Sequence, residues 1–355
     1  RQRQMCIRDS FMVALGSNLS ALWILVANGW MQHPAGAVFN PETMRMEVSN
    51  FKDVIFNPVA QAKFVHTVSA GYVCASLFVL GVSAYYLLRG RHLELAKRSF
   101  TVAAAFGLAS SLSVVVLGDE SGYAVSDNQK MKMAAMEAMW ETEKAPAGLT
   151  LVGLPSNEKH QTAYEIQVPY VLGLIATRSL SGEVTGIIPL VERAEQRMRT
   201  GIVAYDAVEK LKVNRNDLAA REAWERNKDD LGYALLLKRF VADPRQADAA
   251  TITKAAWTTV PNVPALFWMF RVMAGLGFFF IAFFATAFAF SVRRRFNARW
   301  FLRAAVLVMP LPWIAIEVGW LVAELGRQPW AVDGVLPTFL AASSLTVPQL
   351  SLIHI

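Results

Sequence analysis

The chain has 355 residues, of which 54% are hydrophobic and only 18% are charged. This composition is too apolar for an ordinary soluble domain, so the charged residues must be concentrated in part of the chain. The net charge of +7 does not indicate nucleic-acid binding, because the basic residues gather in short turns that lack interleaved aromatic residues. The only two cysteines, Cys6 and Cys74, exclude covalent haem attachment through C-x-x-C-H and thiolate zinc or iron–sulfur sites.

Five apolar stretches are each long enough, at roughly 18–25 residues, to cross a bilayer as a helix. They cover residues 11–30, 66–88, 100–117, 265–290 and 302–324. Pro310 and Pro312 interrupt the fifth stretch, which predicts a kink or a late helix start. The sequence therefore predicts an all-α, polytopic membrane protein.

Two short basic turns orient these helices. Arg89, Arg91, Lys97 and Arg98 lie in the first turn, and Arg293, Arg294, Arg295, Arg299 and Arg303 surround the second. Such turns mark the cytoplasmic side of a membrane protein. Counting crossings from them places the polar segment 119–262, with 18 Lys/Arg and 20 Asp/Glu, on the extracytoplasmic side.

The predicted organisation follows from this count. Residues 11–118 hold three transmembrane helices, 119–262 form a mostly helical extracytoplasmic loop, 263–324 hold two more transmembrane helices, and 325–350 are extracytoplasmic. Within the loop we expect a helix over 127–143, a loop over 144–159, and amphipathic helices near 187–212 and 216–240. Residues 1–10 and 351–355 resemble translated sequencing-adaptor read-through, so we expect both ends to be non-native and the chain to be an internal fragment.

A histidine and a methionine lie at matching depths near the predicted outer surface. His66 is at the outer end of the second helix, and Met273 is in the outer turns of the fourth. An imidazole and a thioether on two helices could hold one haem iron from opposite sides, as in low-spin electron-transfer haems. A hydrogen-bonded interfacial histidine and a methionine that fills a gap in the core are the structural alternatives.

The fifth helix carries two acidic residues. Trp313, Glu317, Trp320 and Glu324 fall at helical spacing on one face. A carboxylate in hydrocarbon costs roughly 2.5–3.5 kcal/mol, so such a residue usually marks a ligand, an ion path or a partner. Glu324 could also be an interfacial residue at the helix end, whereas Glu317 lies about two turns deeper.

Other polar residues gather near the outer boundary. Arg271 and Arg327 could pair with these acids or with haem propionates, or could simply extend to the interface. Asn28, in the first helix, is a buried amide that needs a partner. Lys132 and Glu137, five residues apart in the loop, do not share a helix face and on spacing alone are typical solvated charges.

Several ordered motifs resemble subunit I of the cytochrome bd-type quinol oxidases. They are GSNLSALW at Gly16–Trp23 with ANGWMQ at Ala27–Gln32, KFVHT at Lys63–Thr67, GDESGY at Gly118–Tyr123 and GRQPW at Gly326–Trp330. The similarity runs from about residue 11 to residue 349, and the segment 119–262 resembles the long form of that family's quinol-binding loop.

The resemblance implies a set of cofactors and site residues. It makes His66 and Met273 the axial ligands of a low-spin haem b, and Glu324 the ligand of a high-spin haem b with Trp320 packed between haems. Lys132 and Glu137 match the positions implicated in quinol binding. Arg271, Arg327 and Asn28 match supporting positions near the haems.

The implied reaction is quinol oxidation at the outer face and reduction of oxygen to water, electrogenic without proton pumping. The ligands of the third cofactor, haem d, would lie mostly in N-terminal helices that this sequence lacks, so the fragment alone should be inactive. The implied setting is the bacterial cytoplasmic membrane, beside a second large subunit and small accessory subunits. The alternatives are a quinone-linked cytochrome b without an oxygen site, and a haem-free subunit with a proton path through Glu317 and Glu324.

Overall fold

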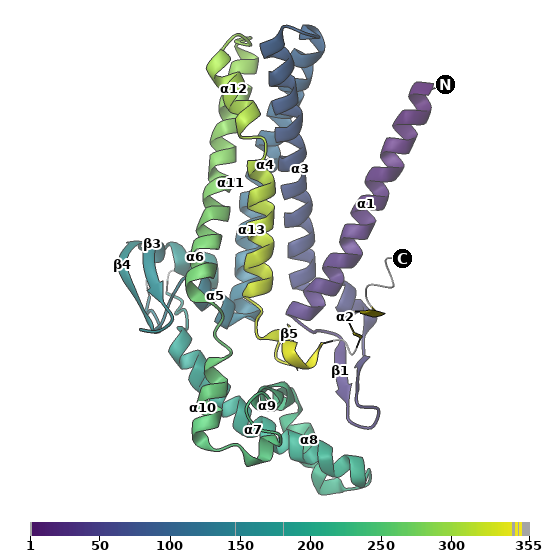
Figure 1. The fold of residues 1–355 in the computed structure, drawn as a ribbon, viewed down its shortest axis with the longest axis vertical. Coiled ribbons are helices and arrows are strands. Elements are labelled where there is room, and N and C mark those ends of the chain that lie inside the picture. Colours follow the sequence, from purple (N-terminus) through teal and green to yellow (C-terminus); the bar gives the residue numbers. More distant parts are fainter. Residues whose placement is uncertain (1, 146, 180, 343–344, 347, 350–355) are drawn as a thin grey trace. The chain divides into compact units, whose positions relative to one another are not determined.

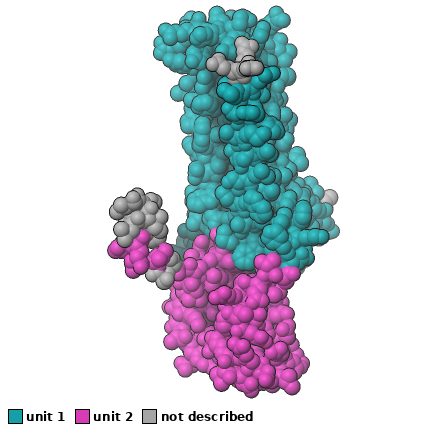
Figure 2. All heavy atoms as spheres, turned by 90° about the vertical axis from the view of Figure 1, so that its right-hand side faces the viewer, with its two compact units in different colours: residues 1–35, 50–189, 262–326 teal, residues 36–49, 190–261, 327–355 magenta. Residues whose placement is uncertain are grey.

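The structure is a computed structural model that describes residues 2–145, 147–179, 181–342, 345–346 and 348–349. The chain divides into two compact units, coloured separately in Figure 2. The first comprises residues 1–35, 50–189 and 262–326, and the second comprises residues 36–49, 190–261 and 327–355. The predicted ends 351–355 lie outside the described residues.

Long helices dominate the first unit (Figure 1). They are α1 (Gln2–Gln32), α3 (Pro58–Arg89), α4 (Leu93–Asn128) and α11 (Val263–Val292), with the shorter α12 (Arg299–Leu307) and α13 (Leu311–Leu325). Five helical spans among the described residues are long and apolar enough to cross a membrane, which confirms the predicted fold class. The predicted break in the fifth stretch is also confirmed, because α12 ends at Leu307 and α13 begins one residue after Pro310.

Local sequence signals set where these helices begin and end. The Asn57 side chain accepts hydrogen bonds from the backbone of Val59 and Ala60 and caps α3, whose first residue is proline. Asn262 caps α11 in the same way, by accepting from the backbone of Ala265. At its other end α3 stops at Gly90, whose φ of +66° is the left-handed conformation that glycine adopts readily.

Aromatic and aliphatic side chains of α3, α4, α11 and α12 form one core cluster. Leu77, Phe100 and Phe284 are at most 1% exposed within it. The ring of Phe284 lies directly over Gly107 of α4, where any side chain would collide with it. The helices therefore pack closely through large-to-small contacts, as is common between membrane helices.

Helix α1 crosses α3 at a glycine. A Cβ placed on Gly29 would lie 2.5 Å from the Cβ of Ala60, so only glycine permits this approach. The remaining length of α1 is largely exposed on this chain. The close crossing brings the last turn of α1 against the beginning of α3, and this contact positions the site described below.

The first part of the polar loop also belongs to the first unit. It contains α5 (Lys130–Met136), the antiparallel strands β3 (Leu149–Ser156) and β4 (Gln161–Val168), and α6 (Val171–Thr177); the short α2 (Phe51–Ile55) precedes α3. Helix α4 continues to Asn128, past residue 118. Two secondary-structure predictions fail here. Residues 144–159, expected to be a loop, contain β3. The predicted helix 127–143 is broken at Gln129, and Ala138 has a left-handed φ of 54°.

The second unit holds the rest of the loop. Its helices are the main part of α7 (Ile187–Val213), then α8 (Leu218–Asn227), α9 (Leu231–Leu237) and α10 (Ala249–Trp257), with hairpins β1–β2 (Ala37–Asn40, Arg45–Val48) and β5–β6 (Trp330–Val332, Leu336–Pro337). Short 3-10 turns cover Lys228–Asp230, Pro244–Gln246 and Thr338–Leu340. The two predicted amphipathic segments are thus helical, although the second is divided between α8 and α9.

Candidate functional site

Asn28 and Glu324 meet at the end of α1. The Asn28 amide donates to Oε1 of Glu324 at 2.8 Å, and its own oxygen accepts from Lys63 Nζ of α3 at 2.8 Å. Three helices thus contribute to one polar chain, which provides the partner that Asn28 requires. The amide also fixes the orientation of the Glu324 carboxylate.

Lys132 of α5 contacts α1 at Gln32, one helical turn after Asn28. It is 2% exposed, and its ammonium donates to Gln32 at 2.6 Å and to Gln129 at 2.7 Å. The Gln32 amide in turn donates to the backbone carbonyl of Ala323 at 3.3 Å. The expectation of a solvated Lys132 from spacing alone is wrong, because α5 folds back over the ends of α1 and α13.

Glu137 is also buried, at 3% exposure, and forms an ion pair of 2.8 Å with Arg271 of α11. The same guanidinium donates to the backbone carbonyls of Met136 and Thr150 and lies 3.5 Å from the centre of the Phe267 ring. Burial raises the pKa of the Glu137 carboxyl, and Arg271 opposes that rise. Arg271 therefore pairs with an acid of the loop rather than with either acid of α13.

His66 lies on α3, eight residues after its first residue, and faces α4. A Cβ on Gly118 would lie 3.3 Å from its Cε1 atom. The Nδ1 atom of its imidazole is buried and has no hydrogen-bond partner among the described residues. A buried imidazole nitrogen without a hydrogen-bond partner is available as a metal ligand.

Met273 lies on α11, ten residues after its first residue, and faces α13. A Cβ on Gly319 would lie 2.8 Å from the Met273 sulfur. By the rise of a helix, His66 and Met273 are about 12 and 15 Å from the first residues of their helices. Each side chain thus faces a glycine on a neighbouring helix.

The other predicted residues are placed differently. Trp320 is 59% exposed, and Glu317 is also exposed, on the same face of α13. Arg327, the first residue of the second unit, is buried and donates to the backbone carbonyl of Ala331. Asn28, Lys132 and Glu324 therefore form hydrogen bonds near the ends of α1 and α13. Glu317 and Trp320, in contrast, are exposed on α13.

The residues present fit a haem better than a metal held by protein side chains alone. No group of three His, Cys, Asp or Glu side chains within the described ranges could hold an ion. A porphyrin supplies four ligands itself, so one or two axial side chains such as His66 and Met273 suffice. The unused Nδ1 atom of His66 and the glycines beside both side chains agree with this requirement.

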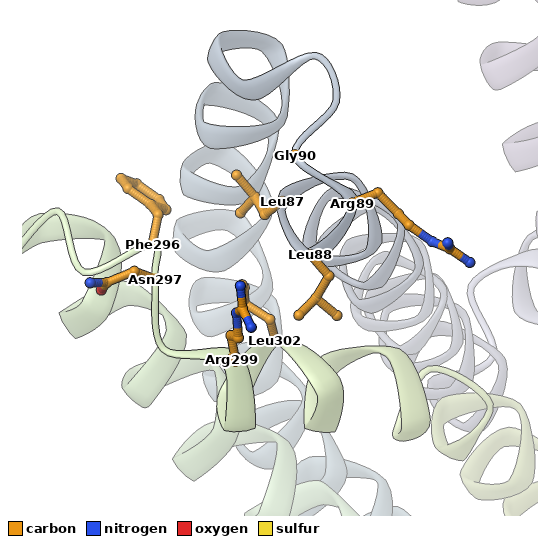
Figure 3. A pocket seen from close by; sticks show the side chains of 8 residues that line it. All are labelled: Leu87, Leu88, Arg89, Gly90, Phe296, Asn297, Arg299 and Leu302. Carbon is orange, nitrogen blue, oxygen red and sulfur yellow. The ribbon is translucent and has the colours of Figure 1, made fainter.

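A pocket of about 360 Å³ lies at the other end of the membrane helices (Figure 3). It is lined by Leu87, Leu88, Arg89, Gly90, Phe296, Asn297, Arg299 and Leu302. Arg89 is 23 residues along α3 from His66, which corresponds to about 35 Å. The pocket belongs to the basic turns and is separate from the cluster around His66.

Three members of the site escaped sequence reasoning. Gln32 and Gln129 bind the Lys132 ammonium, and Lys63 binds Asn28. Gln32 follows Asn28 by four residues and therefore shares its helix face, a signal that was available in the sequence. The contacts of Gln129 and Lys63 depend on how separate helices cross, which spacing does not reveal.

Comparisons with known proteins identify the family to which the chain belongs. The family model for cytochrome bd terminal oxidase subunit I matches residues 2–355. Subunit 1 of the cytochrome bd-II ubiquinol oxidase of Escherichia coli K12 is 42% identical over 96% of this chain and 67% of its own length. Subunit 1 of the cytochrome bd ubiquinol oxidase of Bacillus subtilis 168 is 28% identical over 94% of this chain and 59% of its own.

A solved structure agrees on the fold. The bd oxidase from Geobacillus thermodenitrificans aligns with a TM-score of 0.64 and 22% identity, over 92% of this chain and 61% of that chain. The chain thus spans about 59–67% of the length of these relatives. Together with the five apolar helices, these matches identify an integral membrane protein of a haem-containing, multi-subunit oxidase family. The chain belongs to the cytochrome bd terminal oxidase subunit I family.

Proposed function

We propose that the full-length protein is the haem-carrying subunit of a terminal oxidase that oxidises quinol at the outer membrane face and reduces oxygen to water. Its relatives from Escherichia coli and Bacillus subtilis are subunits of ubiquinol oxidases. The basic turns of this chain support an extracytoplasmic position for the loop and, in a bacterium, the cytoplasmic membrane as its location.

One observation carries this proposal. The two candidate quinol-binding residues of the loop are buried and linked to helices that carry candidate haem ligands, Glu137 directly to α11 and Lys132 through Gln32 to α13. Glu137 pairs with Arg271, two residues before Met273, and Lys132 binds Gln32, which contacts the residue before Glu324. A substrate that contacts Lys132 and Glu137 would therefore sit near both Met273 and Glu324, the candidate ligands of the two haems.

The haem assignment follows from the donor groups. His66 and Met273 would hold a low-spin haem b, and Glu324, oriented by Asn28, would hold a high-spin haem b. Bound haems supply one-electron transfer and oxygen reduction, chemistry that amino-acid side chains do not provide. The ligands of haem d would lie mostly outside this sequence, and Trp320 and Arg327 would have supporting roles.

Lys132 and Glu137 offer complementary groups to a quinol. The Lys132 ammonium can donate to a quinol oxygen, and the Glu137 carboxylate can accept a quinol proton. Because burial raises the pKa of Glu137, its carboxylate is a stronger base than an exposed one. Release of these protons outside, with protons for water taken from the cytoplasm, would make the reaction electrogenic without a pump. A second large subunit and small accessory subunits would complete the enzyme.

The proposal is tested by reduced-minus-oxidised visible spectra of membranes that contain the full-length protein. We expect His66→Ala and Met273→Ala to remove a low-spin b-type band while a far-red chlorin band persists. Glu324→Ala should abolish oxygen reduction and leave the low-spin band intact. Lys132→Met should raise the KM for quinol with all bands intact.

The alternatives give different results. A quinone-linked cytochrome b without an oxygen site would show no chlorin band and would not depend on Glu324. A haem-free proton-path subunit would give a featureless spectrum in the parent protein and in every variant.

A further inference from the structure

The hairpin formed by β3 and β4 has one face buried and one face open. On the buried face, Thr162 donates to the carbonyl of Ala138 at 2.9 Å, and Gly153 lies against the ring of Phe267. Thr150 is 4% exposed on the same face, and its carbonyl accepts from Arg271. The hairpin is therefore fixed to α11 and does not need its open face for attachment.

The open face is apolar. Tyr164 is 85% exposed, Ile166 61% and Leu154 55%. At the open end of β4, Ile166 and Val168 alternate with Glu165 and Gln167, and Gln167 pairs with Thr150 of the buried face, so Ile166 and Val168 point to the other side. Tyr164, with a left-handed φ of 53°, lies at the register shift between the Val152–Ile166 and Leu154–Ala163 pairs, where the alternation is interrupted. Across the pair, Val152 lies opposite Ile166, and Val168 opposite Leu149. Exposed apolar side chains gathered on one hairpin in this way usually mark an interaction site.

The depth of this surface can be derived from α11. The helix has 30 residues, about 45 Å of rise, whereas a hydrocarbon core of about 30 Å needs about 20 residues. Counted back from Val292, beside the basic turn, 20 residues reach Met273. The first turns of α11, from Val263 to Arg271, would therefore lie in the headgroup layer.

The hairpin lies beside those first turns (Figure 1). At the turn end, Asn157 accepts from the backbone of Val263, and at the open end Thr150 accepts from Arg271. The strands therefore run along the part of α11 that occupies the headgroup layer, with the open end closer to the hydrocarbon.

Polarity changes along the hairpin in the same direction. Residues 157–160 of the turn are Asn, Glu, Lys and His, whereas the open end carries Leu151, Val152, Ile166 and Val168. Exposed Tyr164, Tyr170 and Trp268 lie on the hairpin, just after it and in the first turns of α11. Tyrosine and tryptophan are enriched where a membrane protein meets the headgroups.

We propose that the open face of the β3–β4 hairpin is a membrane-docking surface that inserts into the outer headgroup and upper acyl layer of the lipid bilayer beside α11. The lipid surface fits because the open face is apolar and belongs to a hairpin bonded to the interfacial turns of a membrane-spanning helix. Docking would hold the loop segment that carries Lys132 and Glu137 close to the membrane. The inference concerns the hairpin surface and does not depend on the proposed oxidase reaction.

The test uses nitroxide spin labels on the full-length protein with its partner subunit in phospholipid nanodiscs. Single cysteines replace Val152, Ile166 or, as the control in the polar turn, Glu158, in a background in which every native cysteine, Cys74 among them, has been replaced. For each label, power-saturation EPR compares collisions with molecular oxygen, which concentrates in lipid, and with a water-soluble nickel chelate. A native visible spectrum confirms that each labelled protein is folded.

We expect an oxygen-to-nickel collision ratio several-fold higher at positions 152 and 166 than at 158. Equal, nickel-dominated ratios at all three positions would place the face in water and overturn the proposal. Low collision rates with both reagents at 152 and 166 would show that another protein covers the face, and would overturn it equally.

Discussion

Arg271 and Glu137 form a buried ion pair of 2.8 Å between the first turns of α11 and the end of α5. Because Arg271 lies two residues before Met273, the pair attaches a candidate quinol-binding residue directly to the helix that carries a candidate haem ligand. The guanidinium also bonds two loop carbonyls, those of Met136 and Thr150. One side chain thereby fixes the position of the loop on the membrane helix.

Removing this arginine should destabilise the loop. Arg271→Ala leaves the Glu137 carboxylate and two carbonyls buried without their donor, and breaking a buried pair in this way costs about 3–5 kcal/mol. We expect faster proteolysis within the loop and a higher KM for quinol, measured by limited digestion and steady-state oxidation. Arg245→Ala, which removes an exposed arginine elsewhere in the loop, is the matched control and should change neither.

The stability contribution of Glu137 should depend on pH. Its pKa is raised in the folded protein, so the folded state binds the proton more tightly than the unfolded state. This contribution is complete below the ordinary carboxyl pKa and is lost as pH rises through the raised value.

Thermal unfolding of the parent protein and Glu137→Gln should therefore be followed from acidic to neutral pH. We expect the melting temperature of the parent to fall relative to that of the variant as pH rises. If the melting temperature of the parent instead rises relative to that of Glu137→Gln as pH rises, pairing with Arg271 outweighs burial in setting the pKa of Glu137.

Gln32 should affect quinol oxidation although it belongs to α1. It accepts from Lys132 at 2.6 Å and donates to Ala323, so Gln32→Leu removes a hydrogen bond from a charged group. Such bonds contribute about 1.5–3 kcal/mol, and we expect the KM for quinol to rise by about tenfold or more.

Haem content should be unchanged in Gln32→Leu. Gln61→Leu removes a comparable side-chain bond, to the carbonyl of Ile55, away from Lys132 and should leave KM unaltered. In the double variant with Lys132→Met, the two effects on KM should be less than additive. Additive effects would show that Gln32 does not act through Lys132.

Gly319 should control the position of the Met273 sulfur. The Cβ of Gly319→Ala would lie 2.8 Å from that sulfur, so the thioether must move. Because Met/His ligation raises the potential of a haem, we expect a lower midpoint potential for the low-spin haem in a redox titration. Gly275→Ala on α11, where no atom lies within 4 Å of an added Cβ, should leave the potential unchanged.

Gly29 should be required for the crossing of α1 and α3. Gly29→Ala places a methyl group 2.5 Å from Ala60, and overpacking of this kind costs about 1–3 kcal/mol. The separated helices would weaken the Asn28–Glu324 bond, so loss of the high-spin haem signal on heating should begin at a lower temperature. Gly16→Ala on the same helix meets no neighbouring atom and should behave as the parent. Equal melting of the two variants would refute this role for Gly29.

The sequence by itself determined the membrane helices and their order. Apolar length fixed the five spans, Pro310 and Pro312 fixed the break before α13, and Asn57, Gly90 and Asn262 mark helix ends. These features are local: hydrophobicity, side-chain caps and prolines act within a few residues. The expected match in depth of His66 and Met273 rests on the same kind of signal, a count of residues from a helix end, and stays a prediction.

Only the tertiary structure decided which polar groups meet. Spacing along α5 indicated solvated charges at Lys132 and Glu137, yet both are buried, because Gln32 and Arg271 come from helices more than 95 residues away in sequence. The β3–β4 hairpin was missed as well, because its bulged strands lack the regular alternation by which a strand is recognised. Contacts of this kind depend on how closely helices cross, and that is set by glycines such as Gly29, whose effect is seen only beside the partner helix.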